Sequence, residues 1–382
     1  MHRTPWSILA DTRPLSPGDK RYVPRPWGGG ERLAVLVENG LSPIAVTGPS
    51  GSGKTTELNH AARVLGDGAV FPLLLRIDAL MSLADATPGV VLFVVAEAML
   101  DRVIAQDPGL IPSKSVIEDI RSSDPRLPRG KGMRRSPSDL LAVVHAEIQR
   151  MLGHHGQVAL LLDGLDRVAA PVARAAVEGF LDVKDVLPIV VVVDPELATG
   201  PMSRSLLTRY RVFGLPALPV GDDASGHRGF EHLVGVLRAR LHDAYTDEYR
   251  DIAHRAAEKS GGVVRTFCEI LADAASYASI EGAPGPTVQS LSDAIRDRSD
   301  SLRRTLQDGD AEALALANGS DGLEVNLERR IRFLSQGLLL EYADGENSIV
   351  RPHPLLDRVV ESRVPKKPTR KKPTPKKRKA SK

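Results

Sequence analysis

Short apolar runs alternate with helical stripes over the first two hundred or so residues of this chain. Five apolar runs predict strands at residues 43–47, 70–77, 158–163, 189–193 and 212–213. Between them, apolar side chains recur every three or four positions and predict helices at residues 31–39, 58–65, 90–104, 138–151 and 172–186. Strands without polar interruption are typical of a parallel sheet buried on both faces. The pattern therefore predicts a doubly wound α/β domain, with a three-layer parallel sheet, over residues 30–220.

Proline and glycine refine this prediction at three places. Pro72 lacks the N–H group that a sheet ladder needs, so we expect the strand at residues 70–77 at a sheet edge or at its own start. Residues 107–137 are rich in Pro, Gly and Arg, and predict a mobile basic loop. Ser138 is the expected N-cap of the helix that follows this loop. Residues 1–29, also rich in Pro, Gly and Arg, predict an extended arm packed on the domain that follows.

The apolar strands stop near residue 220, and the remaining chain predicts three further parts. Residues 221–285 contain three predicted helices, at 230–242, 247–260 and 263–280, and form the expected helical lid. In residues 286–362, a helix lined by Leu327, Ile331 and Leu334 precedes two short strands around a turn, which suggests a winged-helix-like domain. Residues 363–382 are Lys/Pro-rich and predict a disordered basic tail.

Composition indicates a soluble globular protein with an uneven charge. Hydrophobic residues make up 42% of the chain, and the one cysteine, Cys268, fits a reducing, cytoplasmic location. We expect no signal peptide and no membrane segment, because the first residues lack a long apolar run and residues 90–100 are too few to span a bilayer. Residues 366–382 of the tail carry ten Lys or Arg and no acid; without these ten charges the formal net charge changes from +3 to −7. The body is therefore expected to be mildly acidic.

Residues 48–55 read Gly-Pro-Ser-Gly-Ser-Gly-Lys-Thr and fit the phosphate-binding pattern G-x-x-x-x-G-K-[S/T]. A predicted strand precedes this loop and a predicted helix follows it, which argues against a chance match. Backbone N–H groups of such a loop surround phosphate oxygens, and the helix N-terminus adds partial positive charge. We expect Lys54, exposed in the loop, to reach the β- and γ-phosphates of ATP and the Thr55 hydroxyl to ligate Mg²⁺. The expected nucleotide-binding residues are Gly48, Pro49, Ser50, Gly51, Ser52, Gly53, Lys54, Thr55 and Thr56.

Three aspartates follow predicted strands, where the carboxyl ends of parallel strands form a ligand-binding edge. Asp163 ends the most apolar run and is the expected second anchor of Mg²⁺, with a simple strand terminator as the alternative. Asp166 is a candidate general base for the attacking water; it could equally cap the next helix or pair with Arg167. Asp194 is a candidate sensor of the γ-phosphate, or the N-cap of the helix that begins at Pro195.

Arginines supply the remaining candidate catalytic groups. Arg265 follows Gly261-Gly262-Val263-Val264 at a helix start, where a guanidinium could bridge the lid to bound nucleotide; a solvated surface arginine is the alternative. Arg204, Arg209 and Arg211 precede the fifth strand, and one of them could act as an arginine finger on a neighbouring subunit. The sequence does not distinguish among these three.

The segments Gly-Pro-Ser-Gly-Ser-Gly-Lys-Thr-Thr-Glu-Leu, Leu-Leu-Leu-Asp-Gly-Leu-Asp-Arg and Gly-Gly-Val-Val-Arg resemble, in order, the Walker A, Walker B and sensor 2 motifs of AAA-type and STAND ATPases. Over roughly residues 20–360 the chain is most similar to bacterial members with origin-recognition-like lids and winged helices. Two departures matter: the Asp-Glu pair that is usual in motor-type AAA proteins is replaced by Asp163-Gly164, and Asp194 stands where Asn, Ser or Thr is common at sensor 1. The resemblance implies an ATP- and Mg²⁺-dependent switch with slow turnover, a role common in bacterial signalling and defence.

Two other classes of function stay open at this point. The chain could be a nucleic-acid-binding scaffold that holds nucleotide without turnover, or a P-loop kinase, against which the long lid and the predicted winged helix argue. The basic tail favours nucleic acid as a partner, contacted through phosphates and without sequence readout, because the tail has no aromatic residue. A solubilising tail or an acidic protein partner are the alternatives. A homo-oligomer or an effector protein is a further expected partner, and a membrane is not.

Overall fold

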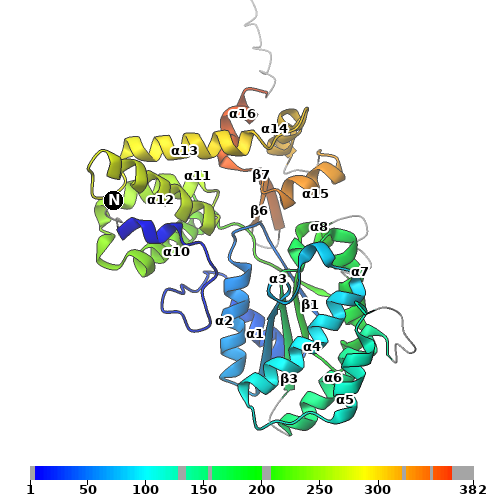
Figure 1. Cartoon of the computed structure of the whole chain (residues 1–382). Helices are drawn as coiled ribbons and strands as arrows, with labels where there is room; N and C mark the ends of the chain where they lie inside the picture. The colour runs from blue at the N-terminus through cyan, green and yellow to red at the C-terminus, as the bar shows by residue number, and fades with distance from the viewer. Residues whose placement is uncertain are drawn as a thin grey trace, which may run out of the picture.

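The computed structural model describes residues 5–127, 135–153, 157–199, 208–320, 324–344 and 347–363. In Figure 1 a helix-covered sheet fills the lower part of the molecule and a mostly helical region lies above it. None of the helices within these described ranges is both long enough and apolar enough to cross a bilayer. The predicted basic tail lies outside the described residues, apart from its first residue, Arg363.

The lower part contains a parallel sheet with the strand order β2-β3-β4-β1-β5. Its strands are β1 (Ile44–Thr47), β2 (Val70–Arg76), β3 (Gln157–Asp163), β4 (Ile189–Val192) and β5 (Arg211–Gly214). All four neighbouring pairs are parallel, so the predicted α/β class with a three-layer parallel sheet is confirmed. Strand β2 is at the sheet edge, as Pro72 indicated, because only one side of this strand needs ladder donors.

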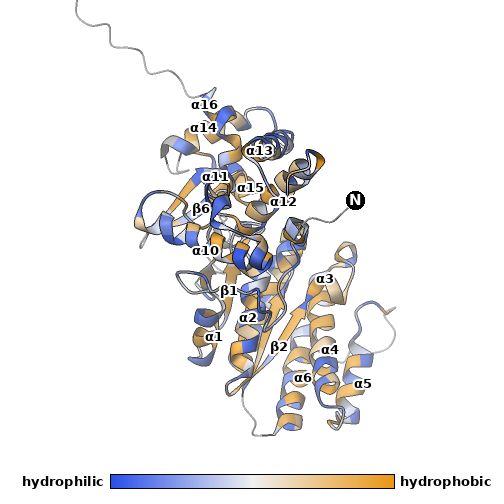
Figure 2. Ribbon diagram, turned by 90° about the vertical axis from the view of Figure 1, so that its left-hand side faces the viewer, coloured by the Kyte–Doolittle hydropathy of each residue, from blue (hydrophilic) through white to orange (hydrophobic). Residues whose placement is uncertain are grey.

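Helices cover both faces of the sheet. The helices of this part are α1 (Gly30–Glu38), α2 (Lys54–Gly66), α3 (Ile77–Leu80), α4 (Pro88–Gln106), α5 (Lys114–Ser123), α6 (Pro137–Leu152), α7 (Ala170–Phe180) and α8 (Pro195–Thr199). Successive residues of a strand point to opposite faces of the sheet and so belong to different apolar clusters. Leu161 packs with α1 and α2 on one face, whereas Leu160 and Leu162 pack with α4, α6 and α7 on the other. Figure 2 shows the labelled strands β1 and β2 as mostly hydrophobic, and the helices as mixtures of hydrophobic and hydrophilic residues.

The structure corrects three local predictions. Residues 107–137 are not one loop, because α5 forms within them and buries Val116 in the large core; residues 128–134 lie outside the described part. The N-cap of α6 is Ser136, not Ser138, because its hydroxyl accepts the Asp139 N–H at 3.1 Å and Pro137 takes the first helical position. Helix α7 ends at Phe180 and continues as a single 3₁₀ turn, Leu181–Val183.

The lid region contains α10 (Ala224–Leu241), α11 (Arg250–Lys259) and α12 (Val264–Ile280). These helices share an apolar cluster with the N-terminal 3₁₀ helix Pro5–Ala10, in which Trp6 and Leu9 are buried. The beginning of the arm therefore packs on the lid, which lies more than two hundred residues later in the sequence. The later part of the arm, from Leu15, packs on the P-loop domain. The prediction that the arm packs on the domain that follows it was incomplete.

The C-terminal unit, residues 288–361, contains α13 (Val288–Arg303), α14 (Asp310–Ser320), α15 (Leu327–Ser335), β6 (Leu339–Asp344), β7 (Asn347–Pro352) and α16 (Asp357–Glu361). Strands β6 and β7 pair in an antiparallel hairpin, as the sequence indicated. Three helices followed by a hairpin are the element order expected of a winged helix. The winged-helix assignment and the domain boundaries stay predictions.

Strand β6 also packs on the connection between the sheet and the lid. Ala217 in that connection donates its N–H to the Glu341 carbonyl at 2.9 Å, and the Tyr342 hydroxyl donates to the Gly261 carbonyl at 3.1 Å. Gly261 has φ +61°, and a Cβ there would lie 2.3 Å from a methyl group of Leu340. The C-terminal unit therefore holds the glycine turn from which α12 begins.

Candidate nucleotide-binding site

The glycine loop connects β1 to α2 at the carboxyl edge of the sheet. Gly51 and Gly53 have φ values of +82° and +97°, a region that side chains with a Cβ rarely adopt. A Cβ on Gly48 would lie 2.3 Å from the Leu215 carbonyl oxygen, so the loop is also closely packed. The Ser52 hydroxyl is buried and has no hydrogen-bond partner among the described residues. A loop of this shape, with an unsatisfied polar atom, fits a phosphate group.

Lys54 is the first residue of α2, and its side chain is buried. Its Nζ donates to the carbonyls of Gly48 at 2.9 Å and Pro49 at 3.3 Å, and lies 3.3 Å from Asp166 Oδ2. The expectation of an exposed lysine was therefore wrong. The helix start turns the side chain back over the loop, and the tertiary contact with Asp166 encloses it.

Thr55 and Asp163 come together as the Mg²⁺ prediction requires. The Thr55 hydroxyl donates to Asp163 Oδ2 at 2.9 Å, and Asp163 is only 2% exposed. Burial raises the pKa of the Asp163 carboxyl, and the neighbouring charge of Asp166 raises it further. A hydroxyl and a carboxylate are hard oxygen donors, and Mg²⁺ is commonly held by one or two such protein groups together with phosphate oxygens and water. The residues present therefore fit this ion.

Asp166 and Gly164 explain part of the departure from the AAA pattern. Gly164 has φ +92°, so a glutamate at this position would be strained. Asp166 follows within the 3₁₀ turn Leu165–Arg167, and its carboxylate faces Lys54. Arg167 pairs with Asp78 of α3. Asp166 is thus the carboxylate that the turn brings beside the phosphate loop.

Asp194 joins the phosphate edge of the sheet to the C-terminal unit. Its Oδ1 accepts the Glu196 N–H at 2.7 Å, which is the contact expected if Asp194 starts α8. The same oxygen accepts the Ser335 hydroxyl at 2.5 Å, and Ser335 is the last residue of α15. The sequence offered capping and sensing as alternatives, and the geometry is compatible with both at once.

Arg265 lies at the start of α12, directly over the glycine loop. Its N–H donates to the Gly51 carbonyl at 3.2 Å, and its Nη1 lies 3.4 Å from the Ser50 hydroxyl. A Cβ on Gly51 would lie 2.7 Å from Arg265 Cβ, so only glycine permits this approach. The Gly-Gly-Val-Val-Arg segment is therefore in direct contact with the glycine loop.

The arm holds the other side of the loop. Arg25 is buried and donates to the Ser52 carbonyl at 2.6 Å and the Pro216 carbonyl at 2.7 Å. Burial lowers the pKa of this guanidinium. Glu57 of α2 accepts the Tyr22 hydroxyl at 2.9 Å and the Gly30 N–H at 2.7 Å, which fixes the end of the arm on the helix.

One cavity of about 320 Å³ includes most of these groups. It is lined by Thr12, Arg13, Pro14, Gly48, Ser50, Gly51, Gly53, Lys54, Thr55, Thr56, Asp166, Arg167, Asp194, Pro195, Arg240, Val264, Arg265, Cys268, Leu334 and Ser335. The arm, the P-loop domain, the lid and the C-terminal unit all contribute to its wall. The volume suits a ligand of small-molecule size.

The candidate trans-acting arginines are not part of this cavity. Arg204 lies outside the described residues, and Arg209 and Arg211 are exposed next to and on the edge strand β5. Their role on a second subunit stays a prediction.

Sequence reasoning missed several residues of the site. Arg13, Arg240 and Ser335 line the cavity, and Arg25 supports the loop. They belong to no motif and lie far from the glycine loop in sequence, so only folding brings them there. The Pro/Gly-rich composition around Arg25 was the one available signal, because a constrained segment next to a glycine loop suggests close packing.

Comparison with solved structures identifies the fold. The chain is similar to the ORC2 protein of Aeropyrum pernix in its ADPNP–ADP complexes, with a TM-score of 0.52 and 14% identity over 93% of this chain and 95% of that chain. Two further structures are more distant. A. pernix ORC1 in complex with DNA has a TM-score of 0.45 and 16% identity over 94% of this chain and 96% of that chain. Drosophila ORC bound to DNA has a TM-score of 0.47 and 13% identity over 94% of this chain and 90% of that chain. No family model and no curated protein matches the sequence. At this identity the ORC2 likeness shows the fold alone: an α/β domain with a five-stranded parallel sheet, followed by a mostly helical C-terminal region. The STAND part of the resemblance stays a prediction.

Lys54 can be tested with Lys54→Met, which keeps the length of the side chain but removes its charge. We expect ATP affinity to fall about 10- to 100-fold, because the charged hydrogen bond to phosphate can no longer form. Calorimetry with ATP and Mg²⁺ measures the change, and Lys20→Met is the matched control because Lys20 does not line the cavity. An affinity equal to that of the unmodified protein would contradict the assignment of this loop. Lys54 is buried, and its replacement leaves Asp166 without this partner. Circular dichroism is therefore needed to establish that the variant is folded before the affinities are compared.

Proposed function

We propose that this protein is an AAA+-type ATPase that binds ATP with Mg²⁺, hydrolyses it slowly and acts as a nucleotide-gated switch. The observation that carries this proposal is the shared cavity, to which the glycine loop, Asp166, Asp194, Arg265 and Ser335 all contribute. A ligand that bridges these groups would contact three separate parts of the chain: the P-loop domain, the lid and the C-terminal unit. The nucleotide complexes of the A. pernix ORC2 protein, which has the same fold, support a nucleotide as that ligand.

The proposed roles follow from the contacts. The glycine loop with Lys54 binds the phosphates, and Thr55 and Asp163 would hold Mg²⁺, which screens phosphate charge when bound. Asp166 is the proposed general base, because its carboxylate lies beside Lys54 and Gly164 leaves no carboxylate directly after Asp163. Lys54 already occupies this carboxylate in an ion pair and so competes with the attacking water for it, which supports slow turnover.

The switch is supported by the contact between Asp194 and Ser335. Asp194 lies on the cavity wall, and a γ-phosphate near it would place two negative charges together. Repulsion of the Asp194 carboxylate would weaken its hydrogen bond to Ser335 and loosen α15 from α8. Nucleotide state would then control how the C-terminal unit is docked.

A second candidate is a nucleic-acid-binding scaffold that holds nucleotide without significant turnover. The unusual Asp163-Gly164 pair favours it, because no glutamate base follows the Mg²⁺ ligand. Steady-state ATP hydrolysis with and without duplex DNA separates the two. Binding without hydrolysis in both conditions would favour the scaffold. A role in signalling or defence rests only on the motif resemblance to STAND proteins.

Asp166 and Asp163 provide a matched pair of variants for the chemistry. Asp166→Asn should leave ATP affinity nearly unchanged and slow single-turnover hydrolysis about 100-fold, since the variant keeps the shape but loses the base. Asp163→Asn should instead reduce the effect of Mg²⁺ on ATP affinity, because the metal loses a charged ligand. Unchanged hydrolysis in Asp166→Asn would show that Asp166 is only the ion-pair partner of Lys54.

Ser335→Ala tests the switch. Removal of a hydrogen bond to a carboxylate, worth about 1–3 kcal/mol, should loosen α15, so that its amides exchange hydrogen faster without nucleotide. In the unmodified protein, ATP should produce a similar increase and ADP should not. Ser348→Ala is the control, because it removes a hydroxyl from β7 of the same unit that is bonded to Glu341 of β6 and not to Asp194. The idea fails if α15 exchanges at the same rate in the ATP and ADP states.

The tail is tested by truncation after Val364. The truncation removes ten positive charges and leaves a body with a formal charge of −7. If the tail binds nucleic acid, the salt dependence of duplex binding should become flatter in the truncated protein, by at most about 0.9 for each phosphate that the tail neutralises. Fluorescence anisotropy of labelled duplex at several salt concentrations measures both slopes. Identical slopes for the full-length and truncated proteins would exclude the tail as the binding element under those conditions.

A further inference from the structure

The residues that line the cavity form two chemically different groups. The first group contains the anionic residues Asp166 and Asp194 together with the loop that is suited to phosphate. The second group contains the arm residues Thr12–Pro14, Val264 and Cys268 of α12, and Arg240 of α10. If the phosphates bind at the glycine loop, as proposed above, we expect the base and ribose to contact this second group.

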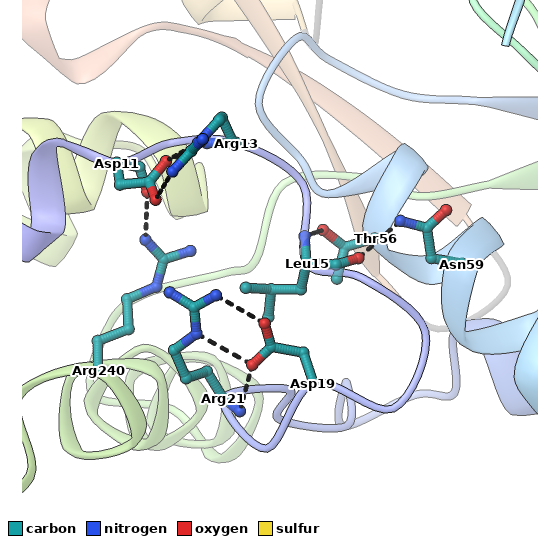
Figure 3. Close-up of polar contacts among 8 residues, drawn as sticks. All are labelled: Asp11, Arg13, Leu15, Asp19, Arg21, Thr56, Asn59 and Arg240. Carbon is teal, nitrogen blue, oxygen red and sulfur yellow. Dashed lines mark hydrogen bonds and ion pairs between the residues drawn. The ribbon is translucent and has the colours of Figure 1, made fainter.

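The arm, which supplies Thr12–Pro14 to this second group, is fixed at two points. Before these residues, Trp6 and Leu9 are buried among the lid helices. After them, Leu15 is fixed on α2, because its N–H donates to the Thr56 hydroxyl at 3.3 Å and its carbonyl accepts from Asn59 Nδ2 at 2.6 Å. Figure 3 shows this crossing segment between α2 and the lid. Residues 11–14 thus span from one part of the molecule to the other.

Arg240 is the contact that fixes the crossing segment in its middle. Its Nη1 donates to the backbone carbonyl of Asp11 at 2.9 Å, from the last turn of α10. Its Nε is buried and has no hydrogen-bond partner among the described residues, although the side chain lines the cavity. A buried N–H without a partner is unfavourable, so the Nη1 bond to Asp11 is the side-chain hydrogen bond that holds this guanidinium in place.

The ion pairs around this contact stiffen the arm itself. Asp11 pairs with Arg13 at 2.8 Å, and Asp19 pairs with Arg21 at 2.6 Å. These pairs lower the pKa of both carboxyls to about 2, so both stay charged at neutral pH. They are local, however, and join residues of the arm only to each other. Among the contacts in Figure 3, Arg240 is the one that joins this part of the arm to the lid.

We propose that Arg240 is a positioning residue for the nucleoside: by holding the Asp11 carbonyl, it fixes residues 11–14 as the wall that retains base and ribose. This inference rests on the proposed nucleotide-binding function. It separates two contributions to affinity. The glycine loop binds the phosphates, whereas the arm, held by Arg240, sets how firmly the nucleoside is retained.

The test compares ATP, ADP and inorganic tripolyphosphate, which has phosphates but no nucleoside. In the full-length protein, Arg240→Ala should weaken ATP and ADP binding about tenfold or more and change tripolyphosphate affinity less than about twofold. Arg240→Lys should restore part of the nucleotide affinity, because an ammonium can still donate to the Asp11 carbonyl. Arg238→Ala is the matched control: Arg238 is on the same helix but pairs with Asp247 on the exposed side.

Hydrogen exchange gives a second readout that does not depend on affinity. The amides of residues 11–15 should exchange faster in Arg240→Ala and not in Arg238→Ala, while the amides of α12 should not change. Unaltered ATP affinity and unaltered exchange would overturn the proposal. An equal decrease of ATP and tripolyphosphate affinity would also overturn it, since Arg240 would then be a phosphate ligand. If the unmodified protein binds neither ATP nor tripolyphosphate, it is the proposed nucleotide-binding function that fails.

Discussion

The backbone of the glycine loop is held from both sides by segments that are remote in sequence. Arg25 of the arm donates to the Ser52 carbonyl, and the N–H of Arg265 in the lid donates to the Gly51 carbonyl. These two carbonyls are adjacent in the chain, so the loop has little freedom between them. A phosphate-binding loop needs its N–H groups preorganised around the ligand, and these two contacts direct neighbouring carbonyls away from that space. The arrangement of arm, lid and P-loop domain follows from this constraint.

The same constraint connects the loop to the C-terminal unit. Helix α12 can reach Gly51 only because the Gly261-Gly262 turn places its first residues there, and both glycines have positive φ. Strand β6 packs on that turn through Leu340 and Tyr342, and α15 reaches Asp194 through Ser335. Movement of the C-terminal unit would therefore change the positions of two residues of the cavity, Arg265 and Asp194. Such a two-point connection is a physical basis for the proposed switch, because docking and nucleotide contacts share residues.

The charge distribution would separate the proposed nucleotide binding from the proposed nucleic-acid binding. The acidic side chains Asp163, Asp166 and Asp194 gather at the carboxyl edge of the sheet, where Lys54, Arg265 and a metal ion would balance them around phosphate. The excess of positive charge is instead in the Lys/Arg-rich sequence after residue 365. With a body of formal charge −7, long-range attraction to a polyanion would come mainly from that segment.

Sequence alone determined what depends on local pattern. Apolar runs with intervening helical stripes specify a parallel α/β sheet, Pro72 marks the edge strand, and the spacing Gly48 to Thr55 specifies the phosphate loop, because each follows from neighbouring residues. The local pattern failed where a long-range contact decides: Lys54 is buried because Asp166 folds over it, and α5 forms because Val116 finds the large core. Only the tertiary structure could bring Arg25, Arg240 and Ser335 to the site. Their positions depend on how arm, lid and C-terminal unit pack on one another, and such packing is set by complementary surfaces that have no periodic signature in the sequence.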